Sequence, residues 1–539
     1  MMSKTIQNQY KTKSFLLFLA LVFISMISGY FHFNSVLGQP IINKNTNTLT
    51  ASSSFNPPVI VDPNPNLIDK KNGNLINDVT LASNINSIRN GTIADGVSKL
   101  LLIAIYNNPI NISIANNDAN FSKGTLSSLS DSSNNLHSSQ KKHSSVIIKP
   151  EMTTIGKSVV VAVYTPPSSV SPTTIPPNKT NGTVKILIHD VNNPSVNSEA
   201  SISLYRVPVV LVHGLWSNDS ISWIKTHFKD TLMKAGFNVS LANYSAYNAE
   251  TFDPYNITKK GNHGIDSIRN LTEQTLQKYH DKAIAASQVD IVGHSMGGLL
   301  SRGFIQQPDY KNINNFKQGY IHRLITIGTP HFGGHLAGFL ITNQNNEYCS
   351  DSSGHLLLKT LCNPTQLKKL NDIFAQLGLS ITKGGVDALI PGSSAYSKMC
   401  QTNISSYAIA ASWAPNAKNS YNDIQYMYRN ITGNPNFDID INGFNGTTHG
   451  NNDLQANITS QLGGLPIQFR IPDSTTLPNQ SEVYNNTVHY FNLLDKNDTH
   501  ATWELNSTKI QNDVIHIFQS PQDKFAPAIG IGSPCEVPQ

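Results

Sequence analysis

The stretch Val289–Ile305, VDIVGHSMGGLLSRGFI, constrains the fold more than any other part of this 539-residue chain. Gly293, Ser295 and Gly297 fit the pattern G-x-S-x-G, with an apolar run before it and apolar residues at helical spacing after it. In this pattern the serine sits on a sharp turn between a buried strand and a helix. The residues two positions away on each side must be small for the turn to close. The pattern therefore predicts a strained backbone at Ser295, with its hydroxyl exposed at the end of a strand.

Strand-like and helix-like segments alternate on both sides of this turn, from about residue 207 onward. The apolar runs VPVVLVHGLW, NVSLANYS and HRLITIGTPHFGG are strand-like, and helical patterns cover WIKTHFKDTLMKAGF and about 265–286. Such alternation predicts βαβ units and a parallel sheet. A helical stretch without a partner strand, at about 340–384, predicts an inserted helical cap. We therefore expect an α/β domain with a cap over residues 207–539.

The residue types around the turn are those of nucleophilic catalysis. A serine hydroxyl needs a general base to accept its proton, and the base needs a carboxylate to hold its tautomer. The tetrahedral intermediate needs two N–H donors directed at its oxyanion. Ser295 is the predicted nucleophile, and the backbone N–H groups of Met296 and Leu215 are the predicted oxyanion donors.

Four segments together resemble the lipase and esterase branch of the α/β-hydrolase superfamily: PVVLVHGLW, VDIVGHSMGGLLSR, LITIGTPHFGG and VDALIPGSSAYSKM. The resemblance covers about residues 208–519 and is specific over 208–334. It implies an α/β-hydrolase fold and hydrolysis of a carboxylic ester, often of a lipid, through an acyl-enzyme and without a cofactor. Some relatives transfer the acyl group or cleave amides or thioesters, and these activities remain alternatives. A catalytically inactive surface adhesion protein is an alternative from another class.

The remaining triad members must follow Ser295 in the order acid, then histidine. His500 lies in the loop LLDKNDTHATWELN before the helical pattern STKIQNDVIHIFQ and is the predicted base, with His489 as the alternative. Asp453, in HGNNDLQANITSQLGG, resembles the relatives' aspartate followed by a serine-rich helix start, although the usual glycine after it is absent. Asp387 competes for this role, but relatives carry such an aspartate near the cap without a triad role. Further candidates for the acid are Asp438 and Asp440.

The substrate, cofactor and partner classes follow from the same residues. Apolar cap residues, with Trp216 and Phe332, are predicted to line an acyl pocket for a small-molecule or lipid ester. No Cys/His group has zinc-site spacing, and DIDING at 438–443 matches only the first half of a calcium-binding loop. We therefore predict no metal, with a calcium ion at this loop as the alternative. The formal net charge of +5 comes without a basic cluster, which argues against nucleic-acid binding.

The N-terminus predicts export to the cell surface or beyond it. Lys4, Lys11 and Lys13 precede the apolar run Phe15–Phe33, which is typical of a signal peptide over residues 1–38. An uncleaved membrane anchor is the alternative, because the run is nearly long enough to span a bilayer. Dense Asn-x-Ser/Thr sequons agree with export and predict a glycoprotein.

The cysteines are consistent with an oxidising compartment. An even number of cysteines in an exported chain suggests disulfides, and four cysteines allow three pairings. We expect Cys349 to pair with Cys362, and Cys400 with Cys535.

The region before the α/β domain predicts two segments. Residues 39–75 are rich in Asn, Thr, Ser and Pro and predict a flexible, disordered tether. Residues 76–206 contain four β-like runs, VSKLLLIAIY, VVVAVYTP, VKILIHDV and ASISLYRV, which predict a β-sandwich. ADGVSKLLLIAI followed by FSKGTLSS resembles the opening of bacterial Ig-like surface domains of the invasin type, which implies a spacer or adhesion role.

Overall fold

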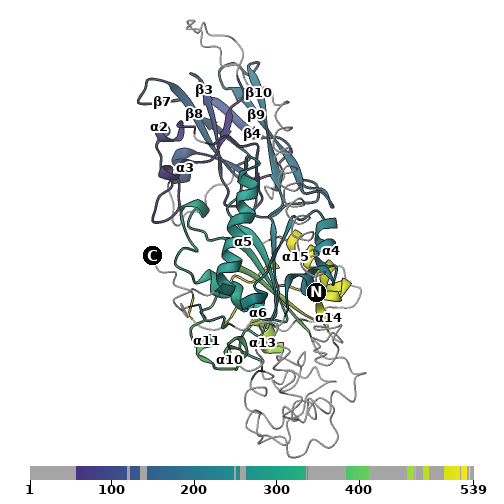
Figure 1. The fold of residues 1–539 in the computed structure, drawn as a ribbon. Coiled ribbons are helices and arrows are strands. Elements are labelled where there is room, and N and C mark those ends of the chain that lie inside the picture. Colours follow the sequence, from purple (N-terminus) through teal and green to yellow (C-terminus); the bar gives the residue numbers. More distant parts are fainter. Residues whose placement is uncertain are drawn as a thin grey trace, which may run out of the picture. The chain divides into compact units, whose positions relative to one another are not determined.

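The computed structural model places two bodies of secondary structure within one compact unit, Ser54–Gln539 (Figure 1). It describes residues 56–85, 87–117, 122–133, 143–215, 217–247, 250–254, 263–334, 337, 384–411, 458–466, 468, 477–484, 503–521, 524–530 and 533–534. The predicted signal segment, most of the predicted cap and three of the four cysteines lie outside these residues. No helix among them is long and apolar enough to cross a bilayer.

A six-stranded parallel sheet forms the centre of the α/β body, in the order β12-β11-β14-β15-β16-β17. Its strands are β11 Val209–Val212, β12 Val239–Ala242, β14 Val289–His294, β15 Ile321–Ile327, β16 Ser405–Ala411 and β17 Ser481–Tyr484. The chain runs from β11 outward to β12, then returns to place β14 on the other side of β11. At such a reversal a crevice opens beyond the carboxyl ends of the strands, and ligands bind there. The predicted α/β fold is confirmed, and Ser295 stands at this reversal.

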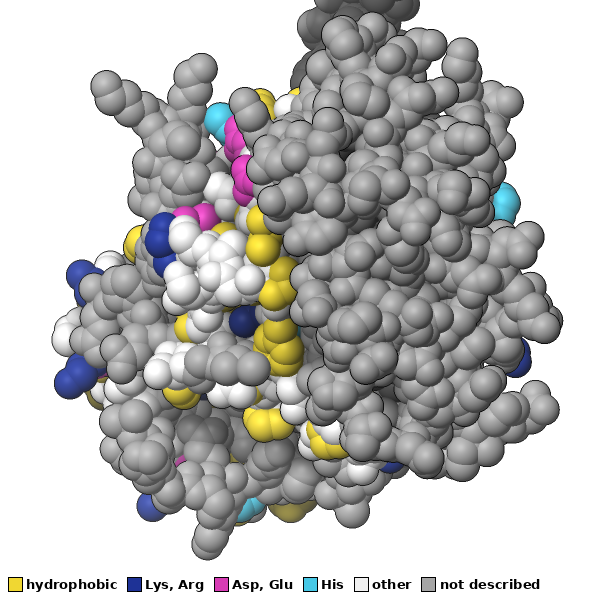
Figure 2. Space-filling model, turned by 90° about the horizontal axis from the view of Figure 1, so that it is seen from below, with side chains coloured by type: hydrophobic (Ala, Val, Ile, Leu, Met, Phe, Trp, Pro, Cys, Tyr) yellow, Lys and Arg dark blue, Asp and Glu magenta, His cyan; other side chains and the backbone are white. Residues whose placement is uncertain are grey.

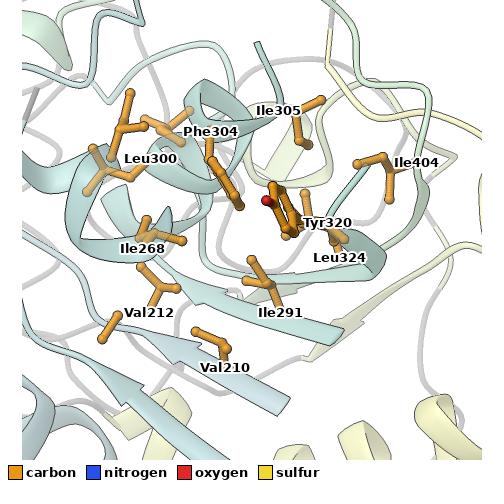
Figure 3. Close-up of a cluster of buried hydrophobic side chains, with 14 of the residues drawn as sticks. Val210, Val212, Ile268, Ile291, Leu300, Phe304, Ile305, Tyr320, Leu324 and Ile404 are labelled. Carbon is orange, nitrogen blue, oxygen red and sulfur yellow. The ribbon is translucent and has the colours of Figure 1, made fainter. Parts of the chain in front are cut away.

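Side-chain alternation along the strands decides which helices cover each face of the sheet. Val210 and Val212 of β11 join a hydrophobic cluster with α5 (His263–His280) and α6 (Met296–Ile305) (Figure 3). Val209 and Leu211 point to the opposite face and pack with residues of α4 (Phe228–Lys234) and α15 (Thr508–Gln519). Because both faces are covered, the central strands read as unbroken apolar runs rather than as an alternating pattern.

Two of the predicted helices differ from their sequence patterns. The pattern predicted over WIKTHFKDTLMKAGF is split into a π-helical turn, η2 (Ser220–Ile224), and α4. His227 between them has a φ of 60°, outside helical backbone, and so ends the first segment. The helix predicted over 265–286 ends at His280, because the residues beyond it enter strand β13 (Ile284–Ala285).

Residues 59–205 form two β-sheets that share a hydrophobic core. One sheet has the order β1-β3-β8-β5 with β7 beside β8, and the other has the order β13-β2-β10-β9-β4-β6. Leu102 and Val160 from the first sheet pack in one cluster with Ile112, Ile186 and Ile202 from the second. The strands are β1 Val59–Val61, β2 Gly91–Ile93, β3 Leu100–Ile105, β4 Ile110–Ile114, β5 Thr125–Ser128, β6 Ser145–Ile148, β7 Glu151–Met152, β8 Ser158–Thr165, β9 Asn181–Asp190 and β10 Asn197–Tyr205.

The sequence identified only part of this body. The four predicted runs contain β3, β8, β9 and β10. The predicted tether differs from the structure over its last part, where β1 pairs antiparallel with β3 and Leu67 and Leu75 are buried. Backbone pairing with a distant strand orders this polar, Pro-rich segment, and its composition carries no sign of that pairing. The Ig-like assignment stays a prediction.

The remaining described helical elements are short. They are η1 Pro65–Leu67, α2 Val79–Ala82, α3 Leu129–Ser133, η3 Ser245–Tyr247, η4 Ile313–Asn315, α10 Gly385–Ala388, α11 Ser394–Ser397, α13 Ile458–Leu462 and α14 Trp503–Asn506.

The two bodies are joined by one strand pairing and by hydrogen bonds. β13 belongs to the α/β body in sequence, yet it pairs parallel with β2 of the β-sandwich. The backbone N–H of Asn90 donates to the carbonyl of Ala283 at 2.7 Å, and Arg89 Nη1 donates to the carbonyl of His280 at 3.1 Å. The β-sandwich sheet is thus completed by the chain that leads into β14.

Arg323, buried in β15, connects three distant segments of the chain. Its Nη1 donates to the Phe518 carbonyl at 2.7 Å, and its Nη2 donates to the carbonyls of Ser520 at 3.3 Å and Ser168 at 3.0 Å. Its guanidinium also lies over the ring of Phe525. One side chain therefore ties the end of α15 and the β-sandwich loop to the parallel sheet.

We expect Arg323→Met to lower the free energy of unfolding by about 2–4 kcal/mol, because three buried or part-buried carbonyls lose their donor. Denaturant unfolding measures this, with the exposed lysine variant Lys225→Met as the matched control. A stability equal to that of the control would contradict the connecting role.

Candidate active site

Ser295 occupies the strained turn that the sequence predicts. It stands between β14 and α6, with a φ of 52° and a ψ of −129°. A positive φ is uncommon for a residue other than glycine. Its backbone N–H donates to the carbonyl of Ile327 at 2.9 Å, which fixes the turn to the neighbouring strand β15. This hydrogen bond to β15 therefore fixes the backbone of Ser295 in its strained conformation.

The small residues of the motif allow three backbone segments to approach one another. A Cβ on Gly293 would lie 2.6 Å from the Cα of Gly298, so the entry and exit of the turn nearly touch. A Cβ on Gly297 would lie 2.4 Å from the carbonyl oxygens of Val212 and His213. The start of α6 is therefore pressed against the end of β11.

The loop after β11 lies directly beside the serine. A Cβ on Gly214 would lie 2.7 Å from Ser295 Cβ. Tyr244 fixes this loop, because its hydroxyl donates to the His213 carbonyl and its ring stacks on the His213 imidazole at 3.9 Å. Leu215 follows in this loop and is partly buried. The structure therefore brings the segment of the predicted donor Leu215 to the predicted nucleophile.

Met296 supplies the other predicted oxyanion donor. It is the first residue of α6 and is 1% exposed. The first N–H groups of a helix have no partner within the helix, and the helix dipole adds partial positive charge there. The N-terminus of α6 can therefore stabilise the negative charge that develops on an oxyanion.

A buried carboxylate–imidazole contact joins the residue before the serine to the C-terminal part of the chain. His294 Nε2 lies 3.3 Å from Glu504 Oε2, and the two side chains are 3% and 1% exposed. Glu504 belongs to α14 and also lies against Gly328, where a Cβ would be 2.5 Å from its Oε2. Neither residue stands out in the sequence, because a buried Glu–His contact across 210 positions leaves no local pattern.

The GTPHFGG loop after β15 also lies beside the serine turn. His331 is buried, and its Nε2 is 3.2 Å from Thr326 Oγ1. Burial, and then the positive charge of Arg302, lower the pKa of His331 well below its usual value, so this imidazole is neutral. Arg302 Nη1 lies 3.3 Å from His331 Nδ1, and the burial of Arg302 lowers its own pKa to about 10.

The structure describes some of the predicted site residues and not others. Ser295, Met296, Leu215 and Phe332 are described, and Phe332 is partly buried, with its N–H donating to Ser460 Oγ at 3.0 Å. Asp387 is exposed on α10, and His516 is exposed on α15. The predicted site residues outside the described part are Asp453, His500, Trp216, Cys349, Cys362 and Cys535, and the alternatives His489, Asp438 and Asp440 lie outside it as well.

Cys400 is disulfide-bonded in the structure. Its neighbour Gln401 donates its N–H to the Ser533 carbonyl at 3.1 Å, so the chain leading to position 535 runs beside Cys400. The pairing of Cys400 with Cys535 stays a prediction.

The parallel sheet and the strained serine turn after β14 together form an α/β-hydrolase fold. Residues 208–369 match the family described as "Putative serine esterase (DUF676)".

The chain is similar to a triacylglycerol lipase from Burkholderia plantarii, with 27% identity over 28% of this chain and 36% of the relative. It is also similar to a triacylglycerol lipase from Pseudarthrobacter phenanthrenivorans, with 29% identity over 25% of this chain and 36% of that relative. It thus spans about a third of the length of these curated relatives.

Similar solved structures include the mature Bacillus licheniformis lipase BlEst2, with 15% identity and a TM-score of 0.32 over 58% of this chain and 92% of that one. The Staphylococcus hyicus lipase has 16% identity and a TM-score of 0.32 over 58% of this chain and 96% of that one.

Gly214→Ala should reduce kcat/KM for an ester by roughly 100-fold or more, since the added methyl displaces Ser295 and small displacements of reacting groups are costly. Turnover of a p-nitrophenyl ester, beside thermal unfolding, measures the effect. Gly156→Ala is the control for backbone strain without a clash, because Gly156 has a φ of 76°, nothing lies within 4 Å of the added Cβ and the turn is in the β-sandwich. Wild-type turnover by Gly214→Ala would show that this loop is not part of the site.

Proposed function

We propose that this protein is an exported serine hydrolase that cleaves carboxylic esters, with lipid or acyl esters as substrates. The observation that carries the proposal is the backbone of Ser295, a positive φ enforced by the close approach of Gly293, Gly297 and Gly214. A positive φ outside glycine is costly and persists where the surroundings enforce it, which is typical of functional sites.

In the proposed reaction, His500 accepts the proton of Ser295 Oγ as the oxygen attacks the ester carbonyl. The N–H groups of Leu215 and Met296 stabilise the oxyanion, and Asp453 stabilises the imidazolium. The tetrahedral intermediate then releases the alcohol, which takes the proton from His500, and an acyl-enzyme remains. Water, deprotonated by His500, attacks the acyl-enzyme and restores Ser295 with release of the acid.

The contact between Glu504 and His294 supports His500 as the base. α14 begins at residue 503, three positions after His500, and three residues span at most about 10 Å. Because the Glu504 carboxylate lies 3.3 Å from the imidazole of the residue preceding Ser295, the segment after His500 is anchored beside the nucleophile.

The placement of α13 supports Asp453 as the acid in the same way. Gln461 exchanges two hydrogen bonds with the backbone of Ala411, the last residue of β16, at 2.8 and 3.1 Å. Ser460 Oγ donates to the Gly333 carbonyl at 2.8 Å. α13 starts at Ile458, five positions after Asp453, and its contacts lie at the carboxyl ends of the strands, which supports Asp453 as an acid on the edge of the sheet that carries Ser295.

Separate observations support the ester substrates and the export of the protein. Two relatives are named triacylglycerol lipases. Described hydrophobic side chains gather in a strip on the face seen from the end that carries α10, α11 and α13 (Figure 2), which supports an apolar acyl group. The basic and apolar N-terminus supports export, with the cap, Trp216 and Phe332 as the proposed acyl-binding surface.

Ser295→Ala should reduce turnover of p-nitrophenyl esters by a factor of about 10⁴ to 10⁶ while leaving the thermal unfolding midpoint nearly unchanged. The substitution deletes one hydroxyl from a turn whose backbone is held by its neighbours. Ser301→Ala, a buried serine in the same helix region, is the matched control and should keep its turnover. A Ser295→Ala protein with more than about a tenth of the wild-type activity would exclude Ser295 as the nucleophile.

Asp453→Asn and His500→Ala should each lower turnover by orders of magnitude, because the base loses its partner or is removed. Asp387→Asn and His516→Ala are the matched controls, since both parent side chains are exposed. Steady-state kinetics on one ester series compares all four proteins. An inactive Asp387→Asn beside an active Asp453→Asn would reassign the acid.

A further inference from the structure

A cavity of about 550 Å³ lies at the junction of the β-sandwich and the α/β body. Its walls come from the loop after β1, the start of β3, the last turns of α5, β13 and the η4 loop. Small buried residues, Ala285, Ala286 and Ser287, form part of its lining. The volume is in the range that small-molecule sites occupy.

Lys99 places an uncompensated positive charge in this cavity. It lines the cavity just before β3 and is partly buried. Among the described residues its ammonium has neither a hydrogen-bond acceptor nor an ion-pair partner. Burial lowers the pKa of Lys99, because the ammonium is only partly solvated by water. A partly desolvated charge without a partner is costly to the fold, and such a charge in a cleft is typical of a binding site.

The other charged groups of the cavity already have partners. Arg89 donates its Nε to Asp62 Oδ2 at 2.7 Å, also donates Nη2 to the same oxygen, and donates Nη1 to the His280 carbonyl. Glu273 Oε1 accepts from the Tyr320 hydroxyl at 3.3 Å. Lys99 is therefore the cation in the described lining that is available to an anion.

The remaining lining offers apolar surface next to this charge. Ile68, Leu276 and Phe316 are buried, and Ile313 is partly buried beside them. A ligand that satisfies both features carries one negative charge and an apolar body. A phosphate, with more charge and more acceptor oxygens, is usually held by several donors, and one lysine does not supply them.

The cavity is separate from the catalytic turn. Ser287 lines the cavity at the amino end of β14, and Ser295 follows the carboxyl end of the same strand. Eight residues of extended chain place the two about 26 Å apart. The ligand at Lys99 is consequently not the ester that reacts at Ser295.

We propose that this junction cavity binds an amphiphilic monocarboxylate, with the carboxylate on the Lys99 ammonium and the hydrocarbon against Leu276, Ile313 and Phe316. The site bridges the two bodies of the protein. The proposed binding at this cavity does not depend on whether Ser295 is catalytic.

Titration calorimetry of the whole protein with decanoate tests the site, with inorganic phosphate as the competing anion. The wild type and Lys99→Arg should bind decanoate with similar affinity, and Lys99→Met should bind it at least 10-fold more weakly. Lys157→Met, an exposed lysine in a β-sandwich turn, should bind as the wild type does. Lys99→Met should unfold at the same temperature or higher, because an unpaired charge is removed.

A second comparison separates this site from the catalytic turn. A bulky phosphonate on Ser295 should leave the Lys99-dependent binding unchanged. The proposal is overturned if decanoate binding is the same in Lys99→Met, if it is lost on phosphonylation of Ser295 alone, or if no binding occurs. Binding of phosphate rather than decanoate at Lys99 would overturn the monocarboxylate assignment.

Discussion

The contact on which the site depends is the close approach of the β11 loop, the serine turn and the start of α6. Gly214, Gly293 and Gly297 are each within about 2.7 Å of a neighbouring segment, measured from where a Cβ would stand. Close packing of backbone on backbone holds Ser295 at a positive φ that it would not adopt alone. The strand reversal between β11 and β14 places this contact at the carboxyl edge of the sheet, the edge at which ligands bind in open α/β sheets. Ser295 itself is 6% exposed among the described residues, less than the exposed hydroxyl that its turn predicts.

The C-terminal third of the chain is attached to the parallel sheet through polar groups. Glu504 reaches His294, Gln461 reaches Ala411, and Arg323 reaches the end of α15. These contacts come from segments that flank the predicted acid and base. The parallel sheet thus positions loops that are distant in sequence. The β-sandwich is attached to the α/β body through β13, which pairs with β2.

The sequence predicted the elements whose signal is local. The serine turn, β11, β12, β14, β15 and α15 follow from apolar runs, small residues and helical spacing. It did not predict β1 or β13, because each is two or three residues long and is ordered by a partner strand far away in sequence. The His294–Glu504 pair was missed for the same reason. Asp453 and His500 were inferred from chain order and resemblance, and their roles remain predictions.

Mapping of a covalent phosphonate adduct tests the central claim, that Ser295 is an activated nucleophile, most directly. The folded protein is treated with a fluorophosphonate, digested and analysed by mass spectrometry. The account predicts one adduct, on the peptide that carries Ser295, and its loss when the protein is unfolded before treatment. An unlabelled folded protein, or an adduct confined to another serine, would contradict it.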